Sequence, residues 1–419
     1  MIKSLVPALF VLLSAFRSPA EFLVRPNDML AITGDSITSE HYYSALLEDY
    51  LLMCQPTKGL SVAQYGWAGE TVPDLLARLD SDVFPFKPTI ATTLHGMNDG
   101  GYTALTDDIG NKYRKAETGL VETLKKNGVR TIVIGSPKCV DPATYKLRNG
   151  ADAAAYNKTL AALAAIDKEV AAMEGVAYAD VFGATVAAMR KAKAQYGDTY
   201  EFGGHDGVHP ELDCSLVITY ALLEALGCDG NIGTLTVDYG RKQAEATPGQ
   251  EIVSYHDGTL TVRSTRYPFC FLGQADTPDY LPAAVLKDVP FNEELNRYLL
   301  VVKGLTTAKA RITWGYASKE YTSAELEKGI NLAAEFLNNP FYEQFGRVHN
   351  CVVLQQAQDQ LLVESFLHKL ERFKAMAPTA AGALDAVAKA GIEQREIMNR
   401  NAMALVIPIQ HTIKIEPIQ

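Results

Sequence analysis

Short apolar runs alternate with amphipathic stretches from residue 29 to about residue 230. The apolar runs predict strands at residues 29–33, 60–65, 89–95, 129–135 and 176–181. Between the third and fourth strands, Tyr113, Leu120 and Leu124 fall on one face of a predicted helix. This order is typical of a three-layer α/β domain with a parallel sheet. We predict a doubly wound sheet rather than a barrel, because a barrel needs eight such units.

The pattern changes after Gly227, where regular helices no longer separate the apolar runs. We predict further strands at residues 234–239, 251–255, 259–265, 298–303 and 411–416. Asp257-Gly258 suits a tight hairpin turn between two of them. Thr322 and Glu325 form a capping box at the start of a helix.

A longer helix is predicted further along, with an apolar stripe of core side chains on one face. Its members are Leu362, Phe366, Leu370 and Phe373. We therefore divide the chain into a signal segment (1–20), an α/β domain (21–230) and a C-terminal β-rich and helical domain (231–419). A length of 419 residues is consistent with about two domains.

The first 20 residues are typical of a secretory signal. Lys3 precedes an apolar run at residues 5–16, and Ser18 and Ala20 place small residues before a cleavage site. The run is shorter than the roughly 20 residues of a membrane-spanning helix. A first core element is the alternative interpretation, and Arg17 near the cleavage site is the main argument against export. We expect a secreted or periplasmic protein.

Composition narrows the class of protein without naming a function. Hydrophobic residues make up 47% of the chain and charged residues 21%, which excludes a disordered chain and a polytopic membrane protein. With 49 acidic and 39 basic residues, the formal charge of -10 argues against general nucleic-acid or anionic-membrane binding. Six cysteines include no CxxC pair, and a disulfide between Cys214 and Cys228 is not expected across a straight helix.

Candidate chemistry begins directly after the first predicted strand. The chain continues as Gly34-Asp35-Ser36-Ile37-Thr38, which places a serine at the start of a helix. A glycine allows close approach to a substrate, and the helix start offers N–H groups to an oxyanion. Taken alone, Gly-Asp-Ser is equally typical of an ordinary turn.

A second group stands near the end of the α/β domain, at Asp206-Gly207-Val208-His209-Pro210. A spacing of three places Asp206 and His209 on the same side of one turn, where the carboxylate can orient the imidazole. Pro210 suits the first turn of the next helix. The alternative is a helix-capping aspartate followed by an incidental histidine.

Two further loops follow predicted strands. Gly69 in Gly66-Trp67-Ala68-Gly69-Glu70 can present a backbone N–H, and Asn98 in His95-Gly96-Met97-Asn98-Asp99 can donate from its amide. Because the carboxyl ends of parallel strands converge on one crevice, we expect these groups to meet Ser36.

These four blocks, in this order, resemble the SGNH or GDSL hydrolase family over roughly half of the chain. The resemblance implies a flavodoxin-like sheet and a serine esterase. It also implies that Ser36 is the nucleophile, His209 the base and Asp206 its orienting partner. The oxyanion hole would consist of the Ser36 and Gly69 N–H groups and the Asn98 side chain, with no metal or other cofactor. The sequence after Pro210 departs from many members, where a small or glycine-rich helix start is usual.

Other classes stay open at this point. The G-x-S-x-G elbow of common lipases, the Walker A loop and the dinucleotide fingerprint are absent from the sequence. A metal-dependent hydrolase is the alternative with different chemistry, using His95, Asp99, His205, Asp206 and His209 as ligands. A glycan-binding module on a decayed hydrolase scaffold is a third class.

The predicted substrate is a small-molecule or polysaccharide ester, with acetyl groups favoured. Lipases, lysophospholipases and thioesterases of the same family are the alternative. Loop residues near the predicted site are mostly polar or small, which suits a hydroxyl-rich alcohol better than a fatty chain. They are Thr38, Glu40, His41, Glu70, Asp99, Gly100, Gly101 and Tyr102.

Overall fold

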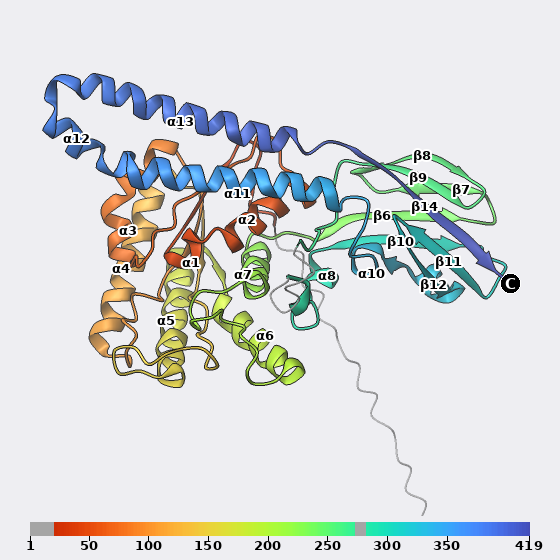
Figure 1. Ribbon diagram of the computed structural model, residues 1–419, viewed down its shortest axis with the longest axis horizontal. Helices are drawn as coiled ribbons and strands as arrows, with labels where there is room; N and C mark the ends of the chain where they lie inside the picture. Colours follow the sequence, from red (N-terminus) through yellow and green to blue (C-terminus); the bar gives the residue numbers. More distant parts are fainter. Residues whose placement is uncertain (1–20, 273–281) are drawn as a thin grey trace, which may run out of the picture.

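The computed structural model describes residues 21–272 and 282–419. The predicted signal segment, residues 1–20, lies outside the described residues. Figure 1 shows an α/β part on one side and a β-rich part on the other, with two long helices running along the α/β part. The predicted boundary at residue 230 remains a prediction.

The α/β part is built on a parallel sheet with the strand order β2-β1-β3-β4-β5. Its strands are β1 Met29–Gly34, β2 Ser61–Gln64, β3 Ile90–Leu94, β4 Thr131–Gly135 and β5 Ala177–Ala179. The strands β1, β3 and β4 are buried along their whole length, as expected when helices cover both faces of a sheet. The prediction of a doubly wound α/β sheet is confirmed.

Helices pack on both faces of this sheet. Contacts join α2, α6 and α7 into one layer and α3, α4 and α5 into another. They are α1 Ser36–Ser39, α2 Tyr42–Asp49, α3 Val72–Arg78, α4 Asp107–Lys126, α5 Ala153–Glu174, α6 Val181–Tyr196 and α7 Leu212–Ala225, with short turns η1 Tyr50–Cys54, η2 Leu79–Val83 and η3 Phe84–Phe86. The predicted helix through Leu120 is α4, whose apolar side chains are buried.

The rest of the chain contributes two sheets, ordered β13-β10-β6-β7 and β12-β11-β14-β9-β8. Their strands are β6 Asn231–Asp238, β7 Gln243–Ala246, β8 Gln250–His256, β9 Thr259–Ser264, β10 Arg297–Lys303, β11 Lys309–Trp314, β12 Ala317–Thr322, β13 Ile330–Asn331 and β14 Ile409–Ile418. Every predicted strand is present, including the last one. The strands β7, β11, β12 and β13 were not predicted; the side chains of β12 are nearly all exposed, so that strand carries no apolar alternation.

Short helices connect these strands, and two long helices return to the α/β part. They are η5 Pro282–Val285, α8 Phe291–Glu294, α9 Ser323–Lys328, α10 Leu332–Glu335, α11 Tyr342–Ser365, η6 Leu367–Lys369, α12 Leu370–Met376, η7 Pro378–Ala380 and α13 Ala381–Ala404. The capping box predicted at Thr322 and Glu325 starts α9. Both α11 and α13 contact β2, and α11 also packs against α2 (Figure 1).

The prediction of one continuous helix through the apolar stripe was wrong. The helix α11 ends at Ser365, and Phe366 has φ -126°, outside the helical range. The break lets Leu367 enter the core, where it is 3% exposed, before α12 begins at Leu370. The burial of Leu367, which is not part of the predicted stripe, therefore outweighed the preference for one continuous helix.

Two global expectations can be compared with the described residues. All six cysteines are free, Cys214 and Cys228 included. Within residues 21–272 and 282–419, no helix combines the length and apolar content needed to cross a membrane.

Candidate active site

Ser36 stands where the first strand meets the first helix. The strand β1 ends at Gly34, and the Asp35 carboxylate caps α1 by accepting a backbone hydrogen bond at 2.9 Å. A methyl group on Gly34 would lie 2.0 Å from Thr38 Oγ1 and 2.7 Å from the Leu94 carbonyl oxygen. Only glycine permits this close turn, which brings Ser36 to the carboxyl edge of the sheet.

His209 and Asp206 complete a hydrogen-bonded row with Ser36. Nε2 of His209 lies 2.8 Å from Ser36 Oγ, and Nδ1 lies 2.9 Å from Asp206 Oδ2. Asp206 Oδ1 accepts the backbone N–H groups of Val208 and His209, both at 2.9 Å. When Nδ1 donates to the carboxylate, Nε2 is left to accept the serine proton. The structure thus brings together the three residues singled out in the sequence.

The start of the next helix differs from the prediction. The helix α7 begins at Leu212 with Glu211 as its N-cap, so Pro210 precedes the helix instead of occupying its first turn. The backbone of His209 is held by the Asp206 carboxylate, because two N–H groups of this turn share one oxygen. Local Asx-type bonding therefore fixes His209 without help from a helix.

Arg148 also binds Asp206, a contact that no sequence motif indicated. Its Nη2 lies 3.1 Å from Asp206 Oδ2, and its guanidinium carbon lies 5.0 Å from the centroid of the Tyr102 ring. Burial raises the pKa of Asp206, but hydrogen bonds from the His209 and Val208 backbones and from the imidazole outweigh burial and hold that pKa well below its ordinary value. Asp206 therefore stays ionised at neutral pH.

The predicted oxyanion donors lie on three separate segments, the start of α1 and two loops. Among the described residues, the backbone N–H groups of Ser36 and Gly69 have no intramolecular acceptor. Gly69 has φ +78°, which favours glycine, and it is exposed. Asn98 Nδ2 donates to the Glu70 carbonyl oxygen at 3.0 Å, and its Oδ1 accepts the Tyr102 hydroxyl at 3.2 Å. One amide hydrogen of Asn98 is thereby held, and the second is available to a ligand.

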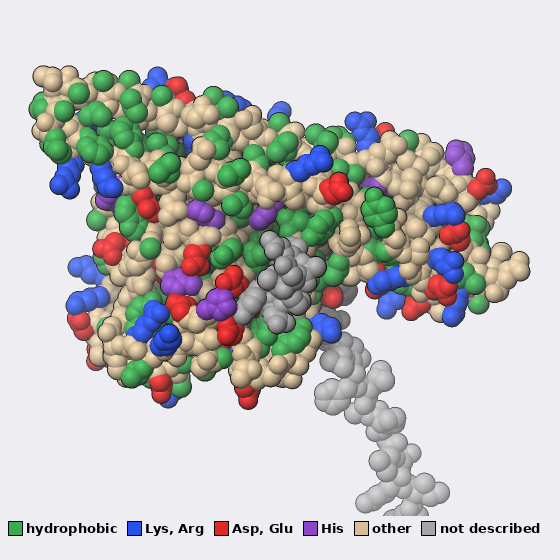
Figure 2. Space-filling model, in the orientation of Figure 1, with side chains coloured by type: hydrophobic (Ala, Val, Ile, Leu, Met, Phe, Trp, Pro, Cys, Tyr) green, Lys and Arg blue, Asp and Glu red, His purple; other side chains and the backbone are tan. Residues whose placement is uncertain are grey.

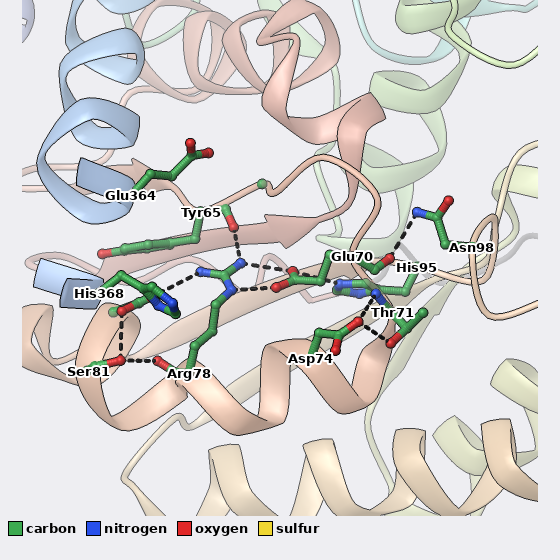
Figure 3. Close-up of polar contacts among 12 residues, drawn as sticks. Tyr65, Glu70, Thr71, Asp74, Arg78, Ser81, His95, Asn98, Glu364 and His368 are labelled. Carbon is green, nitrogen blue, oxygen red and sulfur yellow. Dashed lines mark hydrogen bonds and ion pairs between the residues drawn. The ribbon is translucent and has the colours of Figure 1, made fainter. Parts of the chain in front are cut away.

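Glu70 is a buried anchor behind this loop. Its carboxylate accepts both the Nε and the Nη2 of Arg78, and His95 Nε2 lies 3.4 Å away (Figure 3). Burial lowers the pKa of His95, but the hydrogen bond and the charge of Glu70 raise it above its ordinary value. Sequence reasoning missed this network, because Arg78 lies in an ordinary helical stretch.

The structure does not assemble the alternative metal site. His95 is buried against Glu70, and the exposed His205 pairs with Glu201 at 2.7 Å. The Asp99 carboxylate accepts the backbone N–H groups of Val72 and Gly96 at 2.9 and 3.0 Å, which joins its loop to the start of α3. Across the described parts of the chain, no three His, Cys, Asp or Glu side chains are grouped to hold a metal ion.

Several of the polar loop residues near the site are bound by other groups of the protein. Thr38 is fully buried and shares a 2.7 Å hydrogen bond with the Tyr43 hydroxyl. Glu70 is paired with Arg78, and Asp99 is committed to backbone groups. Polar residues in short loops bond their own backbone as readily as a ligand, so polarity alone did not indicate orientation.

Glu40 remains as an exposed acidic group close to the row. The pKa of the Glu40 carboxyl is raised above its ordinary value, mainly because the group is partly shielded from water. The charges of Asp206 and Glu211 also raise this pKa, whereas the charge of His209 lowers it. Figure 2 shows acidic and histidine side chains gathered on this face of the α/β part, below the long helices. Glu40 and Asp206 thus place acidic charge close to His209.

Known proteins resemble this chain in sequence and in fold. Residues 32–213 match the model of the GDSL-like lipase/acylhydrolase family. A gut microbial diltiazem-metabolizing enzyme has the same fold, with 22% identity and a TM-score of 0.73 over 94% of this chain and 98% of that one. A search of curated proteins gave no match.

Two other structures match about half of this chain. LAE5, an alpha/beta hydrolase from the metagenome of Lake Arreo in Spain, is 27% identical with a TM-score of 0.39, covering 50% of this chain and 99% of its own. The acetylxylan esterase Axe2 from Geobacillus stearothermophilus is 22% identical with a TM-score of 0.41, covering 49% and 96%.

The fold and the site define a serine hydrolase that acts on ester bonds. Residues 32–213, which include Ser36, Asp206 and His209, are similar to the GDSL-like lipase/acylhydrolase family.

Proposed function

We propose that this hydrolase is a secreted esterase that removes short acyl groups, above all acetyl, from carbohydrates. The observation that carries the serine mechanism is the row in which His209 lies 2.8 Å from Ser36 Oγ and 2.9 Å from Asp206 Oδ2. In this proposal Ser36 is the nucleophile, His209 the base and Asp206 the group that orients it.

The reaction proceeds in two balanced halves. Ser36 Oγ bonds to the ester carbonyl carbon while His209 Nε2 takes the hydroxyl proton. The oxyanion receives hydrogen bonds from the Ser36 and Gly69 N–H groups and from Asn98. The C–O bond to the alcohol then breaks, and the alcohol leaves with the proton from His209. Water repeats the sequence on the acyl-enzyme, which releases the acid and restores Ser36.

The surroundings of Ser36 support a polar alcohol as the leaving group. Glu40 is exposed, and Arg148 and Asp206 each keep 35% of their side chains exposed near the serine. Cavities of 1080 and 500 Å³ lie elsewhere, one lined by α7 and β6 residues and one between α11 and α13. Secretion is supported by the composition of residues 1–20.

A lipase, lysophospholipase or thioesterase of the same family is the alternative substrate class. A metal-dependent hydrolase and a non-catalytic glycan-binding module are the alternatives of a different kind. The ionised Asp206 and the row that it orients favour catalysis over binding alone.

Substitution of the serine provides the test. Ser36→Ala should abolish hydrolysis of nitrophenyl acetate and of acetylated xylan without changing the circular-dichroism spectrum, because a loop nucleophile adds little to core packing. Ser39→Ala, on the same helix, should keep most of the activity. A fluorophosphonate should add one phosphonyl group to the wild type and none to Ser36→Ala. Wild-type turnover by Ser36→Ala would contradict the mechanism.

A further inference from the structure

The C-terminal helical segment reaches the loop that carries Gly69. We call residues 65–70 the Gly69 loop. The break between α11 and α12 places His368 in η6, where its ring centroid lies 4.8 Å from that of Trp67. Nδ1 of His368 lies 3.0 Å from Asp82 Oδ2. One side chain from a distant part of the sequence therefore contacts both the loop and its supporting helical turn.

Arg78 connects the two ends of the Gly69 loop. Its Nη2 donates to the Tyr65 carbonyl oxygen at 2.5 Å and to Glu70 Oε2 at 2.8 Å (Figure 3). Its guanidinium carbon lies 5.2 Å from the centroid of the Trp67 ring. Arg78 is 4% exposed, so these contacts are shielded from water. The position of this guanidinium therefore determines the shape of the loop at its start, middle and end.

Glu70 transmits that position to both predicted oxyanion donors outside α1. It directly follows Gly69, and its carbonyl oxygen holds the Asn98 amide at 3.0 Å. A shift of the Glu70 backbone would therefore move the Gly69 N–H and rotate the Asn98 side chain together. Misplacement of such donors by about 1 Å can cost roughly 10²-fold in rate.

Asp82 is the link between His368 and Arg78. It is fully buried, and it lies 3.4 Å from Arg78 Nη1. Its other oxygen accepts the Ser81 hydroxyl at 2.7 Å. A buried carboxylate needs its full set of partners, and His368 is the partner supplied by the C-terminal helices. Without His368, the Asp82 carboxylate would draw Arg78 away from Glu70 or move toward solvent.

We infer that His368 is a positioning residue for ester hydrolysis, which holds the Gly69 loop through Trp67 and through the Asp82–Arg78 pair. The C-terminal helices thereby take part in shaping the oxyanion hole. This inference rests on the proposed function, in which Gly69 and Asn98 stabilise the oxyanion. Because the oxyanion forms only in the transition state, the effect should fall on kcat more than on KM.

His368→Phe in the full chain tests the inference. The variant keeps a ring beside Trp67 but removes the donor to Asp82. We expect kcat for nitrophenyl acetate to fall about 10-fold, with KM changed less than about 2-fold. The expected fall is smaller than the roughly 10²- to 10³-fold effect of deleting a whole oxyanion donor, because the donors are displaced but still present. His368→Asn keeps a donor near the Nδ1 position and should recover most of the rate. If the Phe variant is insoluble, His368→Ala replaces it with the same expectation.

His349, which lies on α11 before the break, provides a matched control in the same C-terminal helical segment. Its Nδ1 lies 2.6 Å from Oδ2 of the fully buried Asp49 on α2, so it makes the same kind of docking contact away from the Gly69 loop. His349→Phe should lower the melting temperature as much as His368→Phe does, with wild-type kcat. An equal loss of kcat in both variants would show a general stability effect and overturn the inference.

A double-mutant cycle with Asn98→Ala tests the route. In the Asn98→Ala background, His368→Phe should lower kcat by clearly less than in the wild type, because a donor that it positions is already absent. If His368→Phe lowers kcat by the same factor in both backgrounds, or if the single variant has wild-type kcat, the inference is overturned. Ser36→Ala separates the two proposals. If it retains activity, the proposed function fails; if it is inactive while His368→Phe has wild-type kcat, only the role of His368 fails.

Discussion

Arg148 and His209 bind the same oxygen atom of Asp206. Arg148 Nη2 lies 3.1 Å from Oδ2, and His209 Nδ1 lies 2.9 Å from it. The guanidinium therefore draws off part of the negative charge with which Asp206 would stabilise a protonated imidazole. In the proposed mechanism His209 must be neutral to accept the serine proton, so Arg148 should keep the base active at lower pH.

Arg148→Gln should therefore shift the acid limb of the kcat/KM profile to higher pH. We expect a shift of about half a pH unit, since the pair is partly exposed and screened. Other charged groups near the row include Asp35, Glu40, Glu211 and Lys138, and all four remain in this variant. Lys146→Gln, an exposed cation on the same loop, is the control and should leave the profile unchanged. A shift toward lower pH would contradict this account.

Asn98→Ala should lower kcat about 10²-fold, because it removes one proposed donor to the oxyanion. Tyr102→Phe should cost only a few-fold, since the Tyr102 hydroxyl acts by orienting the amide through Asn98 Oδ1 at 3.2 Å. Steady-state kinetics with nitrophenyl acetate measure both effects. A larger loss in Tyr102→Phe than in Asn98→Ala would assign Asn98 a merely structural role.

Activity should survive dialysis against a strong chelator, because no step of the proposed reaction uses a metal Lewis acid or metal-bound water. His95, His205 and Asp99, which the metal alternative requires, are each bound to different neighbours. The measurement is esterase activity before and after dialysis, with a portion supplemented with zinc. Inactivation that zinc reverses would favour the metal-dependent alternative.

Acetyl esters should be hydrolysed far better than esters of eight or more carbons. A long chain gains roughly 0.8 kcal/mol for each methylene that it buries, but only where an apolar surface accepts it. The groups around Ser36 are charged, notably Glu40 and Arg148. The test is kcat/KM along a nitrophenyl ester series from acetate to octanoate. A steady rise along that series would favour the lipase or thioesterase alternative.

Glu48→Gln should flatten the pH dependence of stability between about pH 5 and pH 8. Burial raises the pKa of Glu48 to about 8, despite the hydrogen bond from Gln356. A carboxyl group whose pKa is higher in the folded state destabilises the fold as pH rises from its unfolded value toward 8, by up to about 1.4 kcal/mol per pH unit. Urea unfolding of both proteins at several pH values isolates this term, because other buried carboxyl groups such as Asp213 are common to both. Parallel curves would show that Glu48 stays ionised.

The sequence by itself determined the parallel sheet and the meeting of Ser36, Asp206 and His209. Strand periodicity is a local property, and the Asp206 turn needs only a spacing of three residues. Because parallel strands end at one edge of a sheet, the order of the blocks also predicts that Asn98 and Gly69 lie near the serine.

Only the tertiary structure decided which groups surround that row. Arg148 lies in a loop without a motif, and Glu70, one of the polar loop residues near the site, is buried against Arg78. The helix break that brings His368 to Asp82 occurs where the apolar stripe in the sequence predicts one continuous helix. These features depend on contacts between residues far apart in the chain, whose energies outweigh local preference and leave no periodic signal in the sequence.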